Sequence, residues 1–414
     1  MDSPILAGTL SVASLDVRGT AVDVFTYSKT GAVRSERILD AVDEILNAAG
    51  DFLGALPVDR YAFLFHFEDV SMGAWEHSYS STYTFAEADF EPLLQGELAS
   101  IVAHEFLHIV TPLNIHSEVI EQFNFVTPTP SEHVWLYEGT TEWMAQASQV
   151  RGGIIDADTY LARLSAKLRA NDAYDAEWSI SDMSLKSYSA KGQQEWGNIY
   201  QRGAIVAGLL DLEILSRSGG QRGLREVLLD LAATYGPDAA FDEAGFFDEI
   251  AAMTDPELRS FFERYVRDTQ PLPLQELFAR VGVDYLPEVR TGEMVASFGI
   301  NMGLQGDRLI FTGVGEVASA CGLAVGDVLL AMDQVEVTMA TFQQSAAKLE
   351  ALQADEPFVL TVKRGEETLE LTCAKREVER IDRHVLRFDP NATPEQLALR
   401  EAWLTNRAVA PGTR

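Results

Sequence analysis

Two polar pairs in otherwise apolar helical segments constrain this chain more than any other feature. His104 and His108 are four residues apart in "VAHEFLHIV", and Glu138 and Glu142 have the same spacing in "VWLYEGTTEW". Residues four apart lie on one face of a helix, so each pair presents two polar groups in one direction. The apolar and aromatic neighbours indicate buried faces. Two satisfied core histidines and a solvated acidic face are the simpler alternatives.

A metal ion between the two segments would satisfy both pairs. Buried carboxylates are costly unless a cation meets them, and zinc is held by neutral imidazoles and carboxylates. We therefore expect His104, His108 and Glu138 to bind one Zn²⁺ per chain. Glu142 would accept a hydrogen bond from a ligand imidazole, which fixes the ring. Glu105, one position round the first helix, lies near enough to hold a water on that ion without being an obvious ligand.

Other residues with ligand chemistry do not extend this pattern. His116 and His133 lie near the two segments in sequence, but they do not fit the ligand spacing, so we expect structural roles for both. Cys321 and Cys373 are the two cysteines of the chain. Two cysteines in 414 residues are too few for a disulfide scaffold, and we expect free, partly buried thiols.

The hydrophobic period changes twice along the chain. Residues 4 to about 85 alternate as strands do, with one amphipathic helix at 33–56, and residues 92 to about 282 have helical spacing. Residues 295–375 return to short strands and glycine-rich turns. We predict an α+β fold with a domain at 1–290, whose N-terminal part is β-rich and whose C-terminal part is helical. A small β-domain at 291–378 and a tail at 379–414 follow.

The H-E-x-x-H segment and the Glu-Gly helix after it resemble the gluzincin metallopeptidases. Within them the chain is most similar to the glycyl aminopeptidase family, whose members join a thermolysin-like catalytic domain to a C-terminal PDZ domain. The resemblance extends over about residues 4–378 and is most specific at 73–202. It implies a zinc-dependent aminopeptidase that removes N-terminal residues, among them Gly or Ala, from peptides.

Two further segments resemble functional elements of that family. "MGAWEHSYSS" resembles the family's Gly-Gly-Leu-Glu-His strand, which implies that Glu76 binds the free α-amino group of the substrate. "NIYQRGAIVAGLLDLEI" resembles the Tyr-x-Lys-Gly-Ala helix, which implies that Tyr200 stabilises the transition state. A surface carboxylate and a packed tyrosine are the alternatives. The chain departs from its relatives at Ala74-Trp75 and in "IVTPLNIHSEV", and both segments border the expected substrate cleft.

The third part resembles bacterial PDZ domains in "ASACGLAVGDVLLAMDQVEV". A PDZ domain binds an extended peptide by strand addition and holds its C-terminal carboxylate with backbone N–H groups. By position, the carboxylate-binding loop would be Ser297, Phe298, Gly299 and Ile300. A small β-domain used only for packing is the alternative. Peptides with a free C-terminus are therefore possible partners, beside peptide substrates with a free N-terminus.

Composition excludes several classes of partner. The net charge of −31 repels nucleic acid and anionic membranes. No segment has the ~18 consecutive apolar residues of a membrane span. The start "MDSPILAGTL" lacks the basic region and apolar core of a signal peptide. This feature does not decide between the bacterial periplasm and the cytoplasm.

Two alternative functions also stay open: a zinc endopeptidase, and a peptide-binding adaptor with a non-catalytic zinc site.

Overall fold

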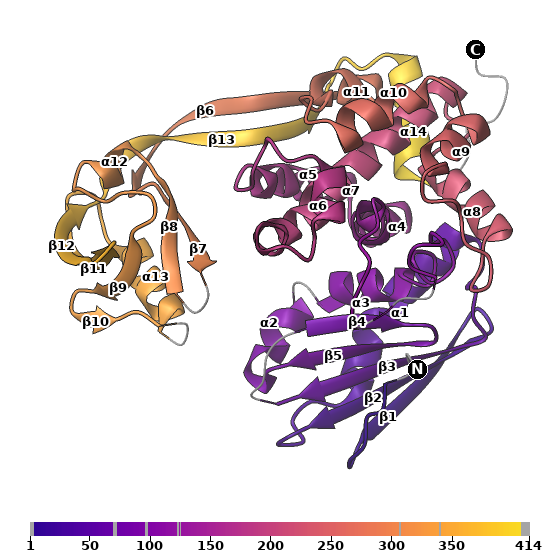
Figure 1. Ribbon diagram of the computed structural model, residues 1–414, viewed down its shortest axis with the longest axis horizontal. Coiled ribbons are helices and arrows are strands. Elements are labelled where there is room, and N and C mark those ends of the chain that lie inside the picture. The colour runs from indigo at the N-terminus through magenta and orange to yellow at the C-terminus, as the bar shows by residue number, and fades with distance from the viewer. Residues whose placement is uncertain are drawn as a thin grey trace. The chain divides into compact units, whose positions relative to one another are not determined.

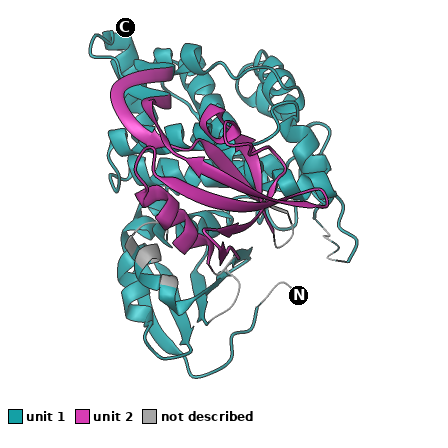
Figure 2. Ribbon diagram, turned by 90° about the vertical axis from the view of Figure 1, so that its left-hand side faces the viewer, with its two compact units in different colours: residues 1–287, 384–414 teal, residues 288–383 magenta. Residues whose placement is uncertain are grey.

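The computed structural model describes residues 4–68, 73–95, 98–121, 124, 126–305, 308–338 and 341–406. The chain divides into two compact units (Figure 2). Unit 1 consists of residues 1–287 and 384–414, and unit 2 consists of residues 288–383. The sequence placed these boundaries after residues 290 and 378.

Unit 1 begins with a five-stranded mixed sheet. Its strands are β1 (Ser11–Val17), β2 (Thr20–Ser28), β3 (Arg60–Phe67), β4 (Gly73–His77) and β5 (Ser80–Phe85), in the spatial order β1-β2-β3-β5-β4. Every second residue of β3 is buried, as the alternation predicted: Tyr61, Phe63, Phe65 and Phe67. Helix α1 (Ser35–Leu53) packs the face formed by Ile38, Val42, Ile45 and Leu46 into the same core. Figure 1 shows the helices on one face of this sheet. Strand β4 lies at the edge of the sheet, beside β5.

The rest of unit 1 is helical, as the spacing predicted. Its helices are η1 (Glu87–Asp89), α2 (Phe90–Gln95), α3 (Leu98–Leu107), η2 (Trp135–Thr140), α4 (Thr141–Arg151), α5 (Ala157–Asn171), α6 (Ile180–Leu185), α7 (Ala190–Ser218), α8 (Leu224–Thr234), α9 (Phe246–Met253), α10 (Leu258–Phe262), η3 (Glu263–Arg267), α11 (Leu274–Arg280) and α14 (Pro394–Leu404). The long helix α7 begins at the N-cap Ser189, whose side chain accepts a hydrogen bond from the Gly192 N–H. It ends at Gly219, whose positive φ of 66° suits a helix C-terminus.

The sequence predicted a separate C-terminal tail at 379–414, and the structure corrects this boundary. Within this segment, residues 384–406 belong to unit 1, because α14 buries Trp403 against the ring of Tyr160 at 5.5 Å. A buried ion pair supports the same contact. The Arg151 guanidinium lies 2.6 Å from the Asp211 carboxylate and also donates a hydrogen bond to the Trp403 carbonyl oxygen at 3.0 Å. This arginine therefore joins α4, α7 and α14.

Unit 2 is a small β-rich unit with its own core. Strands β7 (Ile300–Gln305), β8 (Arg308–Val314), β9 (Val328–Met332), β11 (Pro357–Arg364) and β12 (Glu367–Ala374) form a sheet in the order β12-β11-β9-β8-β7, and β10 (Val335–Glu336) pairs with β9. Helices α12 (Glu316–Ser319) and α13 (Phe342–Ala351) belong to the same unit. Strands β6 (Val283–Ser297) and β13 (Arg376–Phe388) pair with each other and carry the chain into and out of unit 2.

The cysteines of unit 2 correct a second prediction. Cys321 and Cys373 form a disulfide bond, so the expectation of free thiols is wrong. The prediction failed because it used only the number of cysteines, whereas the disulfide depends on how the two cysteines pack in unit 2. The turn after α12 brings Cys321 against β12, and the two Cα atoms lie 5.2 Å apart, within the range that a disulfide spans. The PDZ fold itself stays a prediction.

Within the described part of the chain, no helix combines the length and the apolar composition that crossing a bilayer requires.

Candidate active site

Helix α3 and the residue after it supply two buried imidazoles. His104 lies in the last turn of α3, and His108 directly follows the helix, with its N–H bonded to the His104 carbonyl oxygen at 3.3 Å. Their exposed fractions are 7% and 1%. The helix is held in the core by Val102, Ala103, Phe106 and Leu107, all fully buried. The i, i+4 spacing therefore places both rings on the same side of this buried segment.

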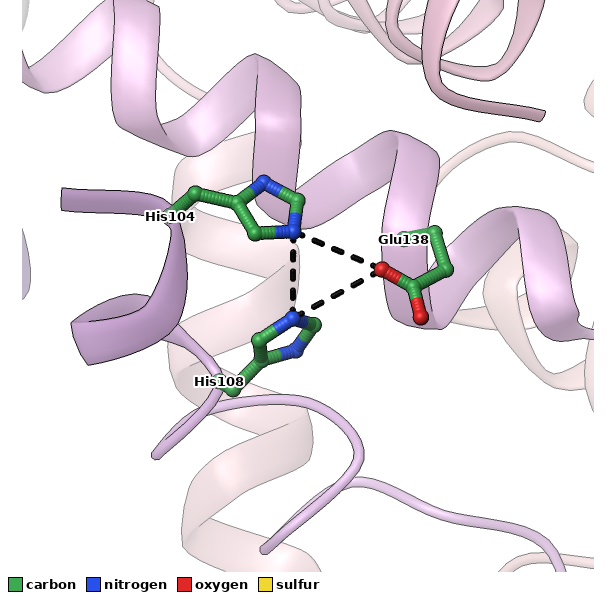
Figure 3. Close-up of side chains that lie close together, drawn as sticks. All are labelled: His104, His108 and Glu138. Carbon is green, nitrogen blue, oxygen red and sulfur yellow. Dashed lines mark hydrogen bonds and ion pairs between the residues drawn. The ribbon is translucent and has the colours of Figure 1, made fainter. Parts of the chain in front are cut away.

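The helix pair η2–α4 brings two carboxylates to these rings. Glu138 lies in η2, a π-helical turn that continues directly into α4, where Glu142 lies in the first turn. π-helical turns inside helices are frequent at functional sites. A carboxylate oxygen of Glu138 lies 3.4 Å from Nε2 of His104 and 3.6 Å from Nε2 of His108 (Figure 3). These three side chains form a cluster whose ligand atoms can hold a metal ion.

The hydrogen bonds of the two rings show that a cation fits this cluster. Nδ1 of His104 lies 3.1 Å from Glu142 Oε2, and Nδ1 of His108 lies 2.9 Å from the Thr111 carbonyl oxygen. Both partners only accept, so each neutral ring carries its proton on Nδ1. The two Nε2 atoms, 3.1 Å apart, then face each other with lone pairs and cannot bond to one another. A metal ion that both nitrogens and Glu138 share resolves this contact.

The same point in the cluster attracts a proton when no metal is bound. Burial acts to lower the pKa of His104, but hydrogen bonds and charges from Glu138 and Glu142 outweigh it and raise the pKa to about 10. For Glu142, burial acts to raise the pKa, yet the His104 hydrogen bond and the Lys167 charge lower it to about 2. The site therefore favours a positive charge between the ligand atoms.

Glu105 points into the site without a fixed partner. Its side chain is buried, and its Oε2 atom has no hydrogen-bond partner among the described residues. Burial raises the pKa of Glu105 to about 7, against the lowering effect of positive charge on His108 and His104. A carboxyl group that titrates near neutral pH can both accept and donate a proton.

Tyr200 and Glu76 reach the same site from other elements. The Tyr200 ring, on α7, lies 5.5 Å from the His104 ring. Burial and the charge of Glu138 raise the pKa of Tyr200, so it remains a neutral hydrogen-bond donor. Glu76 lies on the edge strand β4, and its carboxylate, a Glu105 oxygen and a His108 nitrogen lie within 4.8 Å of one another.

A cleft of about 350 Å³ opens beside these groups. It is lined by Ser100, Ile101, His104, Glu105, Glu142 and Tyr200. The structure thus brings together seven residues that the sequence singled out: Glu76, His104, Glu105, His108, Glu138, Glu142 and Tyr200. His133 instead bonds to the Glu243 carbonyl oxygen at 2.9 Å and packs among three phenylalanine rings. His116 is buried outside the metal cluster.

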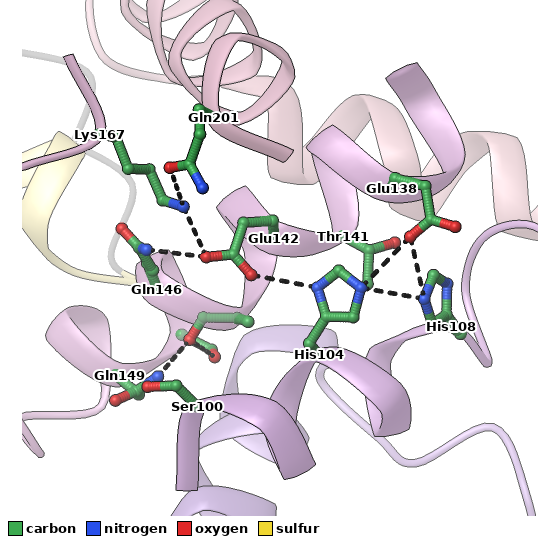
Figure 4. Close-up of polar contacts among 12 residues, drawn as sticks. Ser100, His104, His108, Glu138, Thr141, Glu142, Gln146, Gln149, Lys167 and Gln201 are labelled. Atoms are coloured by element: carbon green, nitrogen blue, oxygen red, sulfur yellow. Dashed lines mark hydrogen bonds and ion pairs between the residues drawn. The ribbon is translucent and has the colours of Figure 1, made fainter. Parts of the chain in front are cut away.

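Sequence reasoning missed three polar residues that surround the ligands: Thr111, Gln146 and Lys167. Figure 4 shows Gln146 and Lys167 beside the Glu142 carboxylate. Thr111 contacts His108 through its backbone carbonyl oxygen, and a backbone contact cannot be predicted from the type of side chain. Gln146 follows Glu142 by four residues, a spacing that could have identified it. Lys167 gives no signal, because a lysine in an amphipathic helix ordinarily lies in solvent.

Unit 2 has a separate groove of about 500 Å³. It is lined by residues of β7, by one side of α13 and by Lys375, and it includes all four residues of the predicted loop: Ser297, Phe298, Gly299 and Ile300. Strand β7 pairs with β8 and lies at the edge of its sheet. Gly299 has a φ of 71°, and its carbonyl oxygen accepts a hydrogen bond from the Gly315 N–H at 2.8 Å.

A backbone contact between two glycines sets the distance between Glu138 and Tyr200. A Cβ atom at Gly139 would lie 2.5 Å from Gly203 Cα and 2.9 Å from the Ile199 carbonyl oxygen, and neither is a flexible group. The turn that carries Glu138 therefore packs directly on the backbone of α7, one turn from Tyr200.

We expect Gly139→Ala to destabilise the fold, because the added methyl group must push α7 away from η2. Overpacking of this kind costs about 1–3 kcal/mol, measured as a lower urea midpoint. Gly208→Ala on the same helix is the matched control, since its Cβ would make an ordinary 3.4 Å contact with Trp143. Equal stability of the two variants would contradict the close approach.

One family profile matches the part of the sequence that forms this site. The sequence profile of the M61 glycyl aminopeptidases matches residues 97–206, the segment that carries the metal cluster and Tyr200. No curated protein sequence matches the chain.

Two of the matching solved structures are peptidase relatives. An aminopeptidase N family protein from Idiomarina loihiensis aligns with a TM-score of 0.71 at 19% identity, over 96% of this chain and 71% of that chain. An M1 zinc metallopeptidase from Deinococcus radiodurans aligns with a TM-score of 0.44 at 14% identity, over 65% of this chain and 54% of that chain. The chain thus shares the mixed α+β fold of the Idiomarina protein, and the M61 match supports the predicted enzyme class, a peptidase among the hydrolases.

Proposed function

We propose that the chain is a zinc-dependent aminopeptidase. One observation carries this proposal: the Glu76 carboxylate lies on an edge strand within 4.8 Å of the base Glu105 and the ligand His108. An anionic group at that place would bind the ammonium group of a peptide N-terminus beside the reacting carbonyl. An edge strand also offers backbone hydrogen bonds to an extended peptide.

His104, His108 and Glu138 would hold one Zn²⁺. When bound, zinc lowers the pKa of a coordinated water and polarises the substrate carbonyl. Glu105 takes a proton from the attacking water as its oxygen bonds to the carbonyl carbon. The C–N bond then breaks, and Glu105 delivers the proton to the leaving amine. Tyr200 donates a hydrogen bond to the oxyanion that forms in between. We propose that peptides with Gly or Ala as the N-terminal residue are among the substrates.

We expect Glu105→Gln to abolish hydrolysis of alanine and glycine p-nitroanilides while zinc remains bound, because the amide keeps the size of the side chain but cannot take up a proton. Loss of a general base typically lowers kcat by about 10²–10⁴. Zinc content measured by atomic absorption separates this loss from a loss of metal. The exposed Glu36→Gln on α1 is the control. Full activity of the Glu105→Gln enzyme would contradict the assigned base.

We expect N-acetylated anilides to resist cleavage, because acetylation removes the ammonium group that Glu76 would bind. Glu76→Gln should lower kcat/KM for free-amine substrates by about 10- to 100-fold, as loss of a charged hydrogen bond does. The enzyme would instead be an endopeptidase if it cleaved acetylated peptides equally well. Bound zinc without any turnover would favour the adaptor function.

The groove of unit 2 supports a second function: capture of a peptide C-terminus by a PDZ-type domain. Edge strand β7 can accept an added strand, and the groove combines apolar walls with the buried residue Lys375, whose Nζ donates one hydrogen bond to the Glu350 carbonyl oxygen at 2.8 Å and has further N–H groups for a ligand. A free carboxylate at the end of an apolar peptide matches this combination.

We expect fluorescein-labelled decapeptides that end in Val, Leu or Phe to bind unit 2 of the full chain more tightly than the same peptides with an amidated C-terminus. Fluorescence anisotropy measures both affinities. Leu349→Arg should abolish binding, because Leu349 lines the groove. Lys348→Met, at the exposed neighbour, is the control. Equal binding of free and amidated peptides would contradict carboxylate capture.

A further inference from the structure

Helix α5 places a lysine where lysines are rarely found. Lys167 is 8% exposed, and one other lysine among the described residues, Lys375, is buried to a similar extent. A buried ammonium group is costly unless it is paired and hydrogen-bonded. Lys167 Nζ lies 2.7 Å from Glu142 Oε1 and donates to Gln201 Oε1 at 3.5 Å (Figure 4). The lysine is therefore held by the residue that contacts a metal ligand.

The two carboxylate oxygens of Glu142 have different partners. Oε2 accepts from Nδ1 of His104 at 3.1 Å, whereas Oε1 faces Lys167 and accepts from Gln146 Nε2 at 3.0 Å. A carboxylate with one oxygen on the imidazole can still rotate about its last bonds. Contacts on the other oxygen remove that freedom, so Lys167 and Gln146 together set the plane in which Glu142 meets His104.

The second ligand imidazole needs no such support. Nδ1 of His108 meets the backbone carbonyl oxygen of Thr111, which the chain itself fixes three residues away. His104 depends on a side chain from another helix, and that side chain depends on Lys167. The metal site is thus rigid on the His108 side by backbone geometry and on the His104 side by an ion pair.

Lys167 also contacts the helix that carries Tyr200. Its second partner, Gln201, is the next residue along α7, and α5 packs against α7. One ammonium group therefore joins α5 to Glu142 of α4 and to α7. This arrangement links the orientation of His104 to the helix that presents the tyrosine.

We propose that Lys167 is a positioning residue of the metal site: its ammonium group holds Glu142 and, through Glu142, fixes the ring of His104 toward the metal. This inference rests on the proposed zinc site. A positioning role differs from a purely structural role. In a structural role, Lys167 would neutralise the buried charge of Glu142 and stabilise the fold without changing the affinity for zinc.

Zinc affinity of the full chain tests the proposal. The protein is stripped with chelator, and the dissociation constant is measured by competition with a chromogenic chelator. We expect Lys167→Met to weaken zinc binding on the order of 10-fold, as changes behind a metal ligand do. Lys191→Met is the matched control, because Lys191 pairs with Asp175 at 2.5 Å on the surface of the same unit.

A double-mutant cycle with Glu142→Gln shows whether Lys167 acts through Glu142. We expect the double variant to bind zinc as Glu142→Gln alone does. It removes both buried charges at once, so it keeps the test available if Lys167→Met does not fold. Wild-type affinity in folded Lys167→Met, or additive losses in the cycle, would overturn the proposal. Failure of the wild-type protein to bind zinc would instead overturn the proposed function.

Discussion

Two histidine nitrogens that face each other with lone pairs form the contact on which the rest of this structure depends. The Nε2 atoms of His104 and His108 lie 3.1 Å apart, and both rings donate their protons in the opposite direction. With both rings neutral, such a contact is unfavourable in a buried site, and a proton or a metal ion between the nitrogens and Glu138 relieves it. The chemistry proposed for Glu105 and Tyr200 follows from a positive charge at that point.

The surrounding fold can be understood as the support for this charge. The core of the sheet and α1 hold α3 in place, and a glycine pair brings η2 onto the backbone of α7. Edge strand β4 carries Glu76 to the open side of the site. Behind the ligands, Lys167 compensates the charge of Glu142, so that this buried carboxylate stays ionised. The groups of the site come from several elements: α3 carries His104 and Glu105, and β4, η2, α4 and α7 carry the others except His108, which directly follows α3.

Local sequence patterns predicted the parts of the molecule that local physics determines. Helical spacing predicted His104, Glu138 and Glu142 in buried helical segments, where the structure has them, whereas His108 directly follows α3; alternation predicted the strands. Spacing did not reveal the π-helical turn at Glu138, nor the close approach of the next residue, Gly139, to the distant Gly203. The disulfide, the docking of Trp403 and the burial of Lys167 depend on contacts between distant segments, which residue type alone does not encode.

Anomalous diffraction at the zinc edge, from crystals grown with zinc, tests the central claim most directly. The account predicts one strong peak per chain, about 2.0–2.2 Å from Nε2 of His104, Nε2 of His108 and one oxygen of Glu138. The Nδ1 atoms should keep their contacts with Glu142 and Thr111. A peak among Glu76, Glu105 and His108, the other cluster whose atoms lie within 4.8 Å of one another, would contradict the assignment of ligands and base. So would the absence of any peak at His104.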